Sequence, residues 1–275
     1  MGNTAQAVSP FTAETGTPDR ERRTLWRPDI YFPIIGGLLL LGIWEVVGRA
    51  VNPILFAPPS RVIQELVGMT LNGRLPRAFL TTMNALSVGY LLSVVVGLVT
   101  GVILGRWKVV ARVLEPYIDA VYATPRVVII PLVILWFGVG YIGRVFIIWI
   151  GTVIPILINT AIGVRNARQD LIEVAKSFGA SERQLARHVT LPGSVPYIAA
   201  GLKIAAGRAL VGVVVAEIFL DLTGLGGIVQ TEAQYFRTAR MLGAVLVIGA
   251  LGTVFIGGLG ALERRFESWR ETPTT

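Results

Sequence analysis

The chain has 275 residues, of which 53 % are hydrophobic and only 15 % are charged, against about 25 % charged residues in ordinary soluble domains. A mean hydropathy of +0.65 points to a membrane protein and argues against a soluble enzyme or a disordered chain. The net charge is +8, and the absence of cysteine with a single histidine, His188, excludes cysteine-based sites and argues against a histidine-based metal site.

The first 28 residues are polar and contain four arginines, and the apolar run 30–47 follows them. This run is longer than the core of a secretory signal, which has about 7–15 residues, and no small-residue cleavage site follows it. We therefore expect a flexible cytoplasmic tail over 1–28. An uncleaved first membrane helix and an extracytoplasmic segment should follow over 29–77.

Five further apolar runs are long enough to span a membrane, which takes about 20 residues for a hydrocarbon core of roughly 30 Å. They cover 81–105, 118–138, 145–164, 197–220 and 241–262. The sequence thus predicts an all-α membrane protein with six transmembrane helices, a core domain over 78–265 and a cytoplasmic tail over 266–275. Pro125, Pro131 and Pro155 lie inside these runs and predict kinks, because proline removes a helical hydrogen bond.

Small residues recur every fourth position along three of the runs, a pattern that lets helix backbones approach closely in lipid. The three series are Gly89, Ser93, Gly97, Gly101 and Gly105; Gly201, Ala205 and Ala209; and Gly249, Thr253 and Gly257. They predict packing within one bundle, with a dimer interface as the alternative.

The distribution of basic residues indicates the orientation, because Lys and Arg accumulate in cytoplasmic loops. With the N-terminus inside, the inside segments hold 15 of the 25 Lys and Arg residues, the outside segments hold seven, and three lie within the spans. We therefore expect both termini in the cytoplasm. Topology accounts for the basic charge, so no nucleic-acid partner is expected.

The polar loop 166–192, between the fourth and fifth spans, has the pattern of two short helices. Two pairs with the spacing of a capping box open them, Asp170 with Glu173 and Ser181 with Gln184. Gly179 between the pairs suits the left-handed residue that ends a helix, and Pro192 is expected to limit the second helix. Such an elbow on the cytoplasmic side could be received in the groove of a soluble partner.

This loop resembles the EAA loop of ABC importer permeases. The matching residues are Glu173, Ala175, Gly179, Leu191 and Pro192, while Val174 stands where the family usually has alanine. Segments 55–60 (LFAPPS), 124–138 (beginning TPR) and 207–217 (beginning GRA) also resemble one subfamily of these proteins. That subfamily comprises the nitrate, sulfonate, taurine and bicarbonate type of binding-protein-dependent permeases.

The resemblance implies a type I ABC importer permease that works by alternating access in the plasma or inner membrane. It implies a cytoplasmic ATPase dimer that binds ATP and Mg, an extracytoplasmic solute-binding protein, and a second permease copy, in a homodimer or with a different permease. The chain has no Walker-type phosphate loop, so neither a cofactor nor enzymatic activity is expected on it.

The implied cargo is a small polar solute, either an anion such as a sulfonate, nitrate or bicarbonate, or a vitamin-like heterocycle. A secondary transporter driven by an ion gradient is the alternative function, although it would not explain the elbow. A membrane enzyme is a third option, but the sequence lacks a catalytic constellation.

Two groups of residues are candidates for function. By resemblance, the ATPase coupling residues are Glu173, Ala175, Phe178, Gly179, Leu191 and Pro192. Glu173 could instead only cap its own helix, and Phe178 could fold back on the bundle. Arg126, Arg208 and Glu217 are charges at membrane depth, which either line the translocation path or form a buried ion pair, with Arg126 and Glu217 as one pairing. No metal site is expected.

Overall fold

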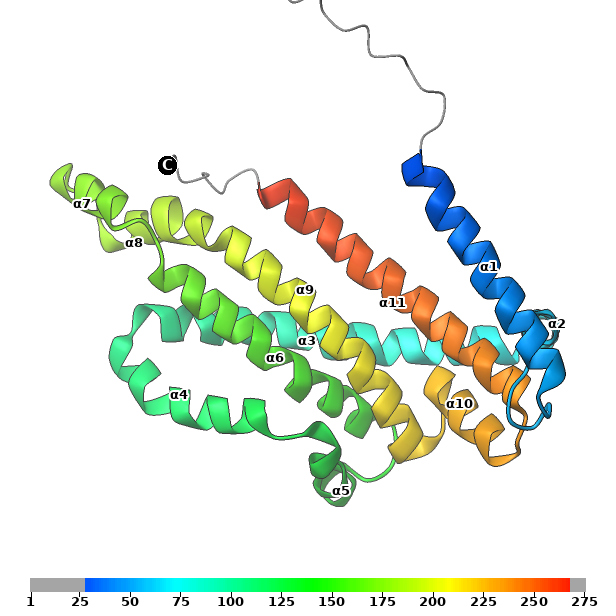
Figure 1. Ribbon diagram of the computed structural model, residues 1–275. Helices are drawn as coiled ribbons and strands as arrows, with labels where there is room; N and C mark the ends of the chain where they lie inside the picture. Colours follow the sequence, from blue (N-terminus) through cyan, green and yellow to red (C-terminus); the bar gives the residue numbers. More distant parts are fainter. Residues whose placement is uncertain (1–27, 268–275) are drawn as a thin grey trace, which may run out of the picture. The chain divides into compact units, whose positions relative to one another are not determined.

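The computed structural model describes residues 28–267, and this part of the chain is wholly helical apart from short connections (Figure 1). Most of both predicted tails lies outside the described residues. Contacts divide the chain into a first unit, Met1–Ile43, and a second, Trp44–Thr275. The described part of the first unit is the apolar beginning of α1 (Pro28–Ala50), and the second unit holds every other element.

The elements of the second unit follow one another through short loops. They are α2 (Pro59–Leu71), α3 (Arg74–Arg106), α4 (Lys108–Ala123), α5 (Arg126–Phe137), α6 (Tyr141–Arg165), α7 (Gln169–Ser177), α8 (Glu182–Leu185), the π-helical turn η1 (Ala186–Thr190), α9 (Leu191–Ala216), a second π-helical turn η2 (Glu217–Asp221), α10 (Gly224–Gln234) and α11 (Thr238–Glu267). Helices α3, α6 and α9 pack against one another and form the centre of this unit (Figure 1).

Within the described residues, five helical segments are long and apolar enough to cross a membrane, and a bent helix pair makes a sixth if it counts as one span. The predicted number of six spans agrees with the structure if this pair is one span, but the third run differs from a kinked helix. It is divided into α4 and α5, which meet at 99° around Thr124 and Pro125. The backbone of Thr124 is extended because a proline follows it, so the helix ends there instead of bending.

Glycines on α3 bring this helix into close contact with α6. A Cβ added at Gly89, Gly97, Gly101 or Gly105 would lie 2.5–2.9 Å from side-chain atoms of α6. The predicted packing within one bundle is therefore confirmed for this series. It is also confirmed for Gly201 on α9, where a Cβ would lie 2.7 Å from Asn159.

The small residues of α11 behave differently. A Cβ added at Gly249 or at Gly257 would meet nothing within 4 Å among the described residues. The expectation that this third series packs inside the bundle is wrong for these two glycines. The reason is that α11 turns another face, which includes Ala244 and Leu251, toward the core.

Helix α9 belongs to a longer continuous helical segment. The helical path runs from Glu182 to Asp221 through α8, η1, α9 and η2. Pro192 does not end the second short helix, contrary to expectation. It lies in the first turn of α9 directly after a π turn, where the missing N–H costs least.

Candidate functional site

The loop between α6 and α9 forms the predicted elbow. Helix α7 ends in a Schellman motif, in which Gly179 N donates to the Lys176 carbonyl at 2.9 Å and Ala180 N donates to the Ala175 carbonyl at 3.0 Å. Gly179 has a φ of +79°, so it supplies the left-handed residue that the motif needs. The two short helices are therefore joined by a defined corner instead of a flexible link.

The two predicted capping boxes have different outcomes. Ser181 and Gln184 form the box that opens α8, with Ser181 N donating to Gln184 Oε1 at 2.8 Å. Asp170 does not cap α7. It lies in the first helical turn and pairs with Arg168 at 2.6 Å, and this hydrogen-bonded guanidinium lowers the pKa of the Asp170 carboxyl. The helix dipole favours a carboxylate in the first turn as well as at the N-cap, so the sequence pattern around Asp170 is compatible with either position.

The elbow presents apolar side chains to its surroundings. Phe178 is 88 % exposed, so it does not fold back on the bundle, and Leu171 and Val174 are exposed beside it on α7. A cavity of about 320 Å³ under the corner is lined by Ala175, Phe178, Gly179, Ala180, Gln184, Leu185, His188 and Val189. An exposed aromatic side chain next to a hollow is a typical anchor of a protein interface.

The remaining predicted coupling residues lie near this surface without joining the cavity. Glu173 is exposed on α7, makes no ion pair with any described side chain and does not cap its helix. Leu191 and Pro192 begin α9, and Leu191 is exposed. The structure thus brings together Ala175, Phe178 and Gly179.

A second cavity, of about 520 Å³, lies between α5, α6 and α9. Two arginines line it, Arg126 and Arg208, together with the apolar side chains of Val127, Ile147, Ile204, Val211 and Val215. Arg126 begins α5 directly after the break at Pro125, and its guanidinium donates to the carbonyls of Arg208 at 2.7 Å and Gly151 at 3.0 Å. Arg208 donates to the Tyr122 hydroxyl at 2.6 Å and lies over the Tyr122 ring.

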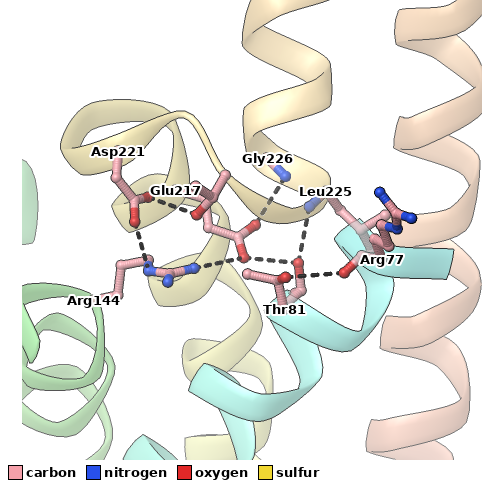
Figure 2. A network of polar contacts seen from close by, with 9 residues as sticks. Arg77, Thr81, Arg144, Glu217, Asp221, Leu225 and Gly226 are labelled. Carbon is pink, nitrogen blue, oxygen red and sulfur yellow. Dashed lines mark hydrogen bonds and ion pairs between the residues drawn. The ribbon is translucent and has the colours of Figure 1, made fainter. Parts of the chain in front are cut away.

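Glu217 is separate from these arginines and fully buried. Its carboxylate accepts a hydrogen bond from Gly226 N at 2.9 Å, which Figure 2 marks with a dashed line. It also accepts one from the Thr82 hydroxyl at 2.7 Å. Arg144 lies 3.8 Å from this carboxylate and 3.1 Å from that of Asp221 (Figure 2). The suggested pair of Arg126 with Glu217 is therefore wrong, because Arg144 of α6 occupies the place of the cation.

Two residues of these networks were missed by the sequence reasoning. The predicted topology counts Arg144 among the seven basic residues of the outside segments, but it lies in the first turn of α6 and is only 6 % exposed. Its position directly before the charge-free run 145–164 gave no signal of burial. Tyr122 lies at the end of α4, and nothing in the sequence paired it with Arg208, 86 positions away.

A family model described as binding-protein-dependent transport system inner membrane component matches residues 93–268. The taurine transport system permease protein of Escherichia coli is 29 % identical over 263 residues, covering 90 % of this chain and 94 % of that protein. The bicarbonate transport system permease protein of Synechocystis is 29 % identical over 250 residues, covering 86 % and 89 %.

Among solved structures, an inward-facing form of the MetNI methionine ABC transporter contains a chain of similar fold. Its TM-score is 0.59 at 20 % identity, and the match covers 70 % of this chain and 95 % of that one. At this identity the similarity shows the fold alone.

Proposed function

Because this chain belongs to the family of binding-protein-dependent transport system inner membrane components, we propose that its helices form the solute path of an importer driven by separate ATPase subunits. The chain is a multi-pass permease subunit of an ABC transporter and is not itself an enzyme. ATP and Mg bind to the partner ATPase, and the permease needs no cofactor of its own.

The exposed elbow is the observation that supports coupling to an ATPase. Phe178 is the most exposed aromatic residue of the described chain, and a capping box and a Schellman motif hold the corner behind it. A shaped apolar surface of this kind gains binding free energy without first having to order a loop. We assign this end to the cytoplasm, in agreement with the basic residues of the loop.

The proposed mechanism is alternating access in a homodimer of this chain. ATP binding closes the two ATPase subunits, the elbows move with them, and the spans reorient between outward-open and inward-open states. The solute changes this equilibrium only to the extent that it binds one state more tightly than the other. A solute-binding protein delivers the solute on the outer side.

The proposed cargo is a small polar solute that carries an oxyanion group. The relatives named above are described as permeases for taurine, a sulfonate, and for bicarbonate. A vitamin-like heterocycle is the alternative cargo. The cargo can be identified from what is bound to a co-purified binding protein.

Co-purification in mild detergent tests the coupling role of the elbow. We expect the tagged permease to retain an ATPase at about one copy per permease. Phe178→Asp should release it, since removing an interface anchor costs about 2 kcal/mol or more, or roughly 30-fold in affinity. Gly179→Asp should also release it, because a side chain at a left-handed position costs about 1–2 kcal/mol and displaces the corner.

The matched control is Leu71→Asp, which places the same charge on an apolar residue that is 83 % exposed at the end of α2. This variant should retain the ATPase. If the permease purifies alone and still transports solute without ATP, a transporter driven by an ion gradient replaces the proposal. If all three variants keep the ATPase, the coupling surface lies elsewhere.

A further inference from the structure

Arg126 and Arg208 present unneutralised positive charge to a cavity at membrane depth. Arg126 uses two backbone carbonyls as acceptors, and Arg208 uses the hydroxyl and ring of Tyr122. Among the described side chains no carboxylate forms an ion pair with either guanidinium, whereas the neighbouring Arg144 has two. Each guanidinium has five N–H donors, so most of these donors lack a protein acceptor.

Such an arrangement is costly unless another group compensates for it. The two positive charges repel each other. Arginine keeps its proton under all physiological conditions, so neither residue can relieve this repulsion by becoming neutral. The other side chains of the cavity wall are apolar, among them Val127, Ile147 and Ile204, and they cannot solvate the charge. Charged residues within a membrane protein usually face a partner or a solute pathway.

The shape and chemistry of the cavity fit a small oxyanion. Its volume of about 520 Å³ lies within the range of small-molecule sites. The planar fork of a guanidinium matches two oxygens of a sulfonate, nitrate or carbonate group. The backbone carbonyl of Arg208 fixes the Arg126 guanidinium, and both arginines line the same cavity.

We propose that Arg126 and Arg208 form a binding site for a small dissolved oxyanion within the permease, as a station that the solute passes during import. This inference rests on the proposed function and deepens it, because it places part of the selectivity in this chain as well as in the binding protein. The phosphate of an anionic lipid has the same chemistry, so the test must separate the two sources.

Arginine footprinting gives a direct readout. The permease, with whatever subunits co-purify, is placed in nanodiscs of neutral phosphatidylcholine and treated with phenylglyoxal, and modification of each arginine is followed by peptide mass spectrometry. Methanesulfonate serves as the probe and dimethyl sulfone as its neutral control of similar shape. We expect methanesulfonate to slow the modification of Arg126 and Arg208, dimethyl sulfone to have no effect, and the exposed Arg61 on α2 to react equally in both.

Variants test whether the two guanidinium groups act together. Arg208→Gln should raise the methanesulfonate concentration that half-protects Arg126 by roughly 10- to 100-fold, because hydrogen bonds to charged groups are the strong ones. Arg208→Lys keeps the positive charge, so it should raise this half-protecting concentration by less than Arg208→Gln does. Tyr122→Phe keeps the ring under Arg208 and should preserve protection, and Arg61→Gln is the matched control outside the cavity.

Two results with neutral nanodiscs would overturn the inference: no protection of Arg126 and Arg208 by methanesulfonate, or equal protection by dimethyl sulfone. A third would be protection of these arginines in nanodiscs that contain the anionic lipid phosphatidylglycerol, without any methanesulfonate. The last result would assign the site to a lipid headgroup. The proposed function is tested by a separate experiment, the co-purification of the ATPase. A permease that retains its ATPase but shows no anion protection therefore contradicts only the site.

Discussion

Glu217 shows how a charged residue at membrane depth can be structural. Its carboxylate joins three elements, because it accepts from Thr82 of α3 and from Gly226 at the start of α10 while it faces Arg144 of α6. Gly224 allows this approach, since a Cβ at that position would overlap the carboxylate. Of the two roles considered for Glu217, the buried ion pair is the one that these contacts favour.

Replacement of Glu217 by alanine should be strongly destabilising. It would leave the buried Thr82 hydroxyl and Gly226 N without their acceptor and would remove one of the two carboxylates that face Arg144, and breaking a buried pair in this way costs about 3–5 kcal/mol. The measurement is thermal unfolding in detergent followed by intrinsic tryptophan fluorescence. Glu182→Ala is the control, because the ion pair of Glu182 with Arg106 is exposed and contributes about 1 kcal/mol or less. Equal melting temperatures for both variants would contradict the structural role.

At the level of elements, the contact of α3 with α6 depends on the absence of side chains. Gly101 makes the tightest backbone contact of this series, since a Cβ there would lie 2.7 Å from the Leu157 carbonyl as well as 2.5 Å from Thr160 Cβ. The backbone carbonyl cannot move aside as a side chain can. Any side chain at this position therefore has to push the two helices apart.

We expect Gly101→Ala to destabilise the permease by about 1–3 kcal/mol, the usual cost of overpacking. Gly249→Ala on α11 makes the same change where the added methyl group meets nothing within 4 Å. That variant should leave the melting temperature unchanged or raise it, because alanine is the better helix former. A larger decrease in melting temperature for Gly249→Ala than for Gly101→Ala would contradict the view that the glycines of α3 are needed for its close contact with α6.

How far the sequence predicts these elements depends on the range of the interaction. The spacing of Gly89 to Gly105 and the capping box of Ser181 are local patterns, and both led to the observed structure. The proline at 125 is compatible with a kink or a full break, and only the neighbouring helices decide between them. The burial of Arg144 depends on Asp221 and Glu217, more than 70 positions away, so no local pattern reveals it.

For the whole molecule, the orientation in the membrane is the most direct prediction to test. The natural chain contains no cysteine, so single cysteines can be introduced without removing any. Arg183→Cys at the elbow and Leu71→Cys at the end of α2 place thiols at exposed positions. With the elbow in the cytoplasm, a membrane-impermeant maleimide should label Cys at 71 in right-side-out vesicles and Cys at 183 only after permeabilisation. The reverse pattern would invert the proposed orientation and exclude an ATPase at the elbow.

The continuous helical segment from Glu182 to Asp221 has a consequence for how its parts are aligned. Forty residues follow a path of about 60 Å, twice the thickness of the hydrocarbon core. This one segment carries the end of the elbow, Arg208 and Glu217, so their directions around the helix axis are fixed relative to one another. Inserting a single residue would rotate everything beyond it by about 100° and turn Arg208 or Glu217 away from its partners. The two π turns at its ends are the places where the helix can absorb such a change. The length of α9 between them is thus as constrained as the identity of its residues.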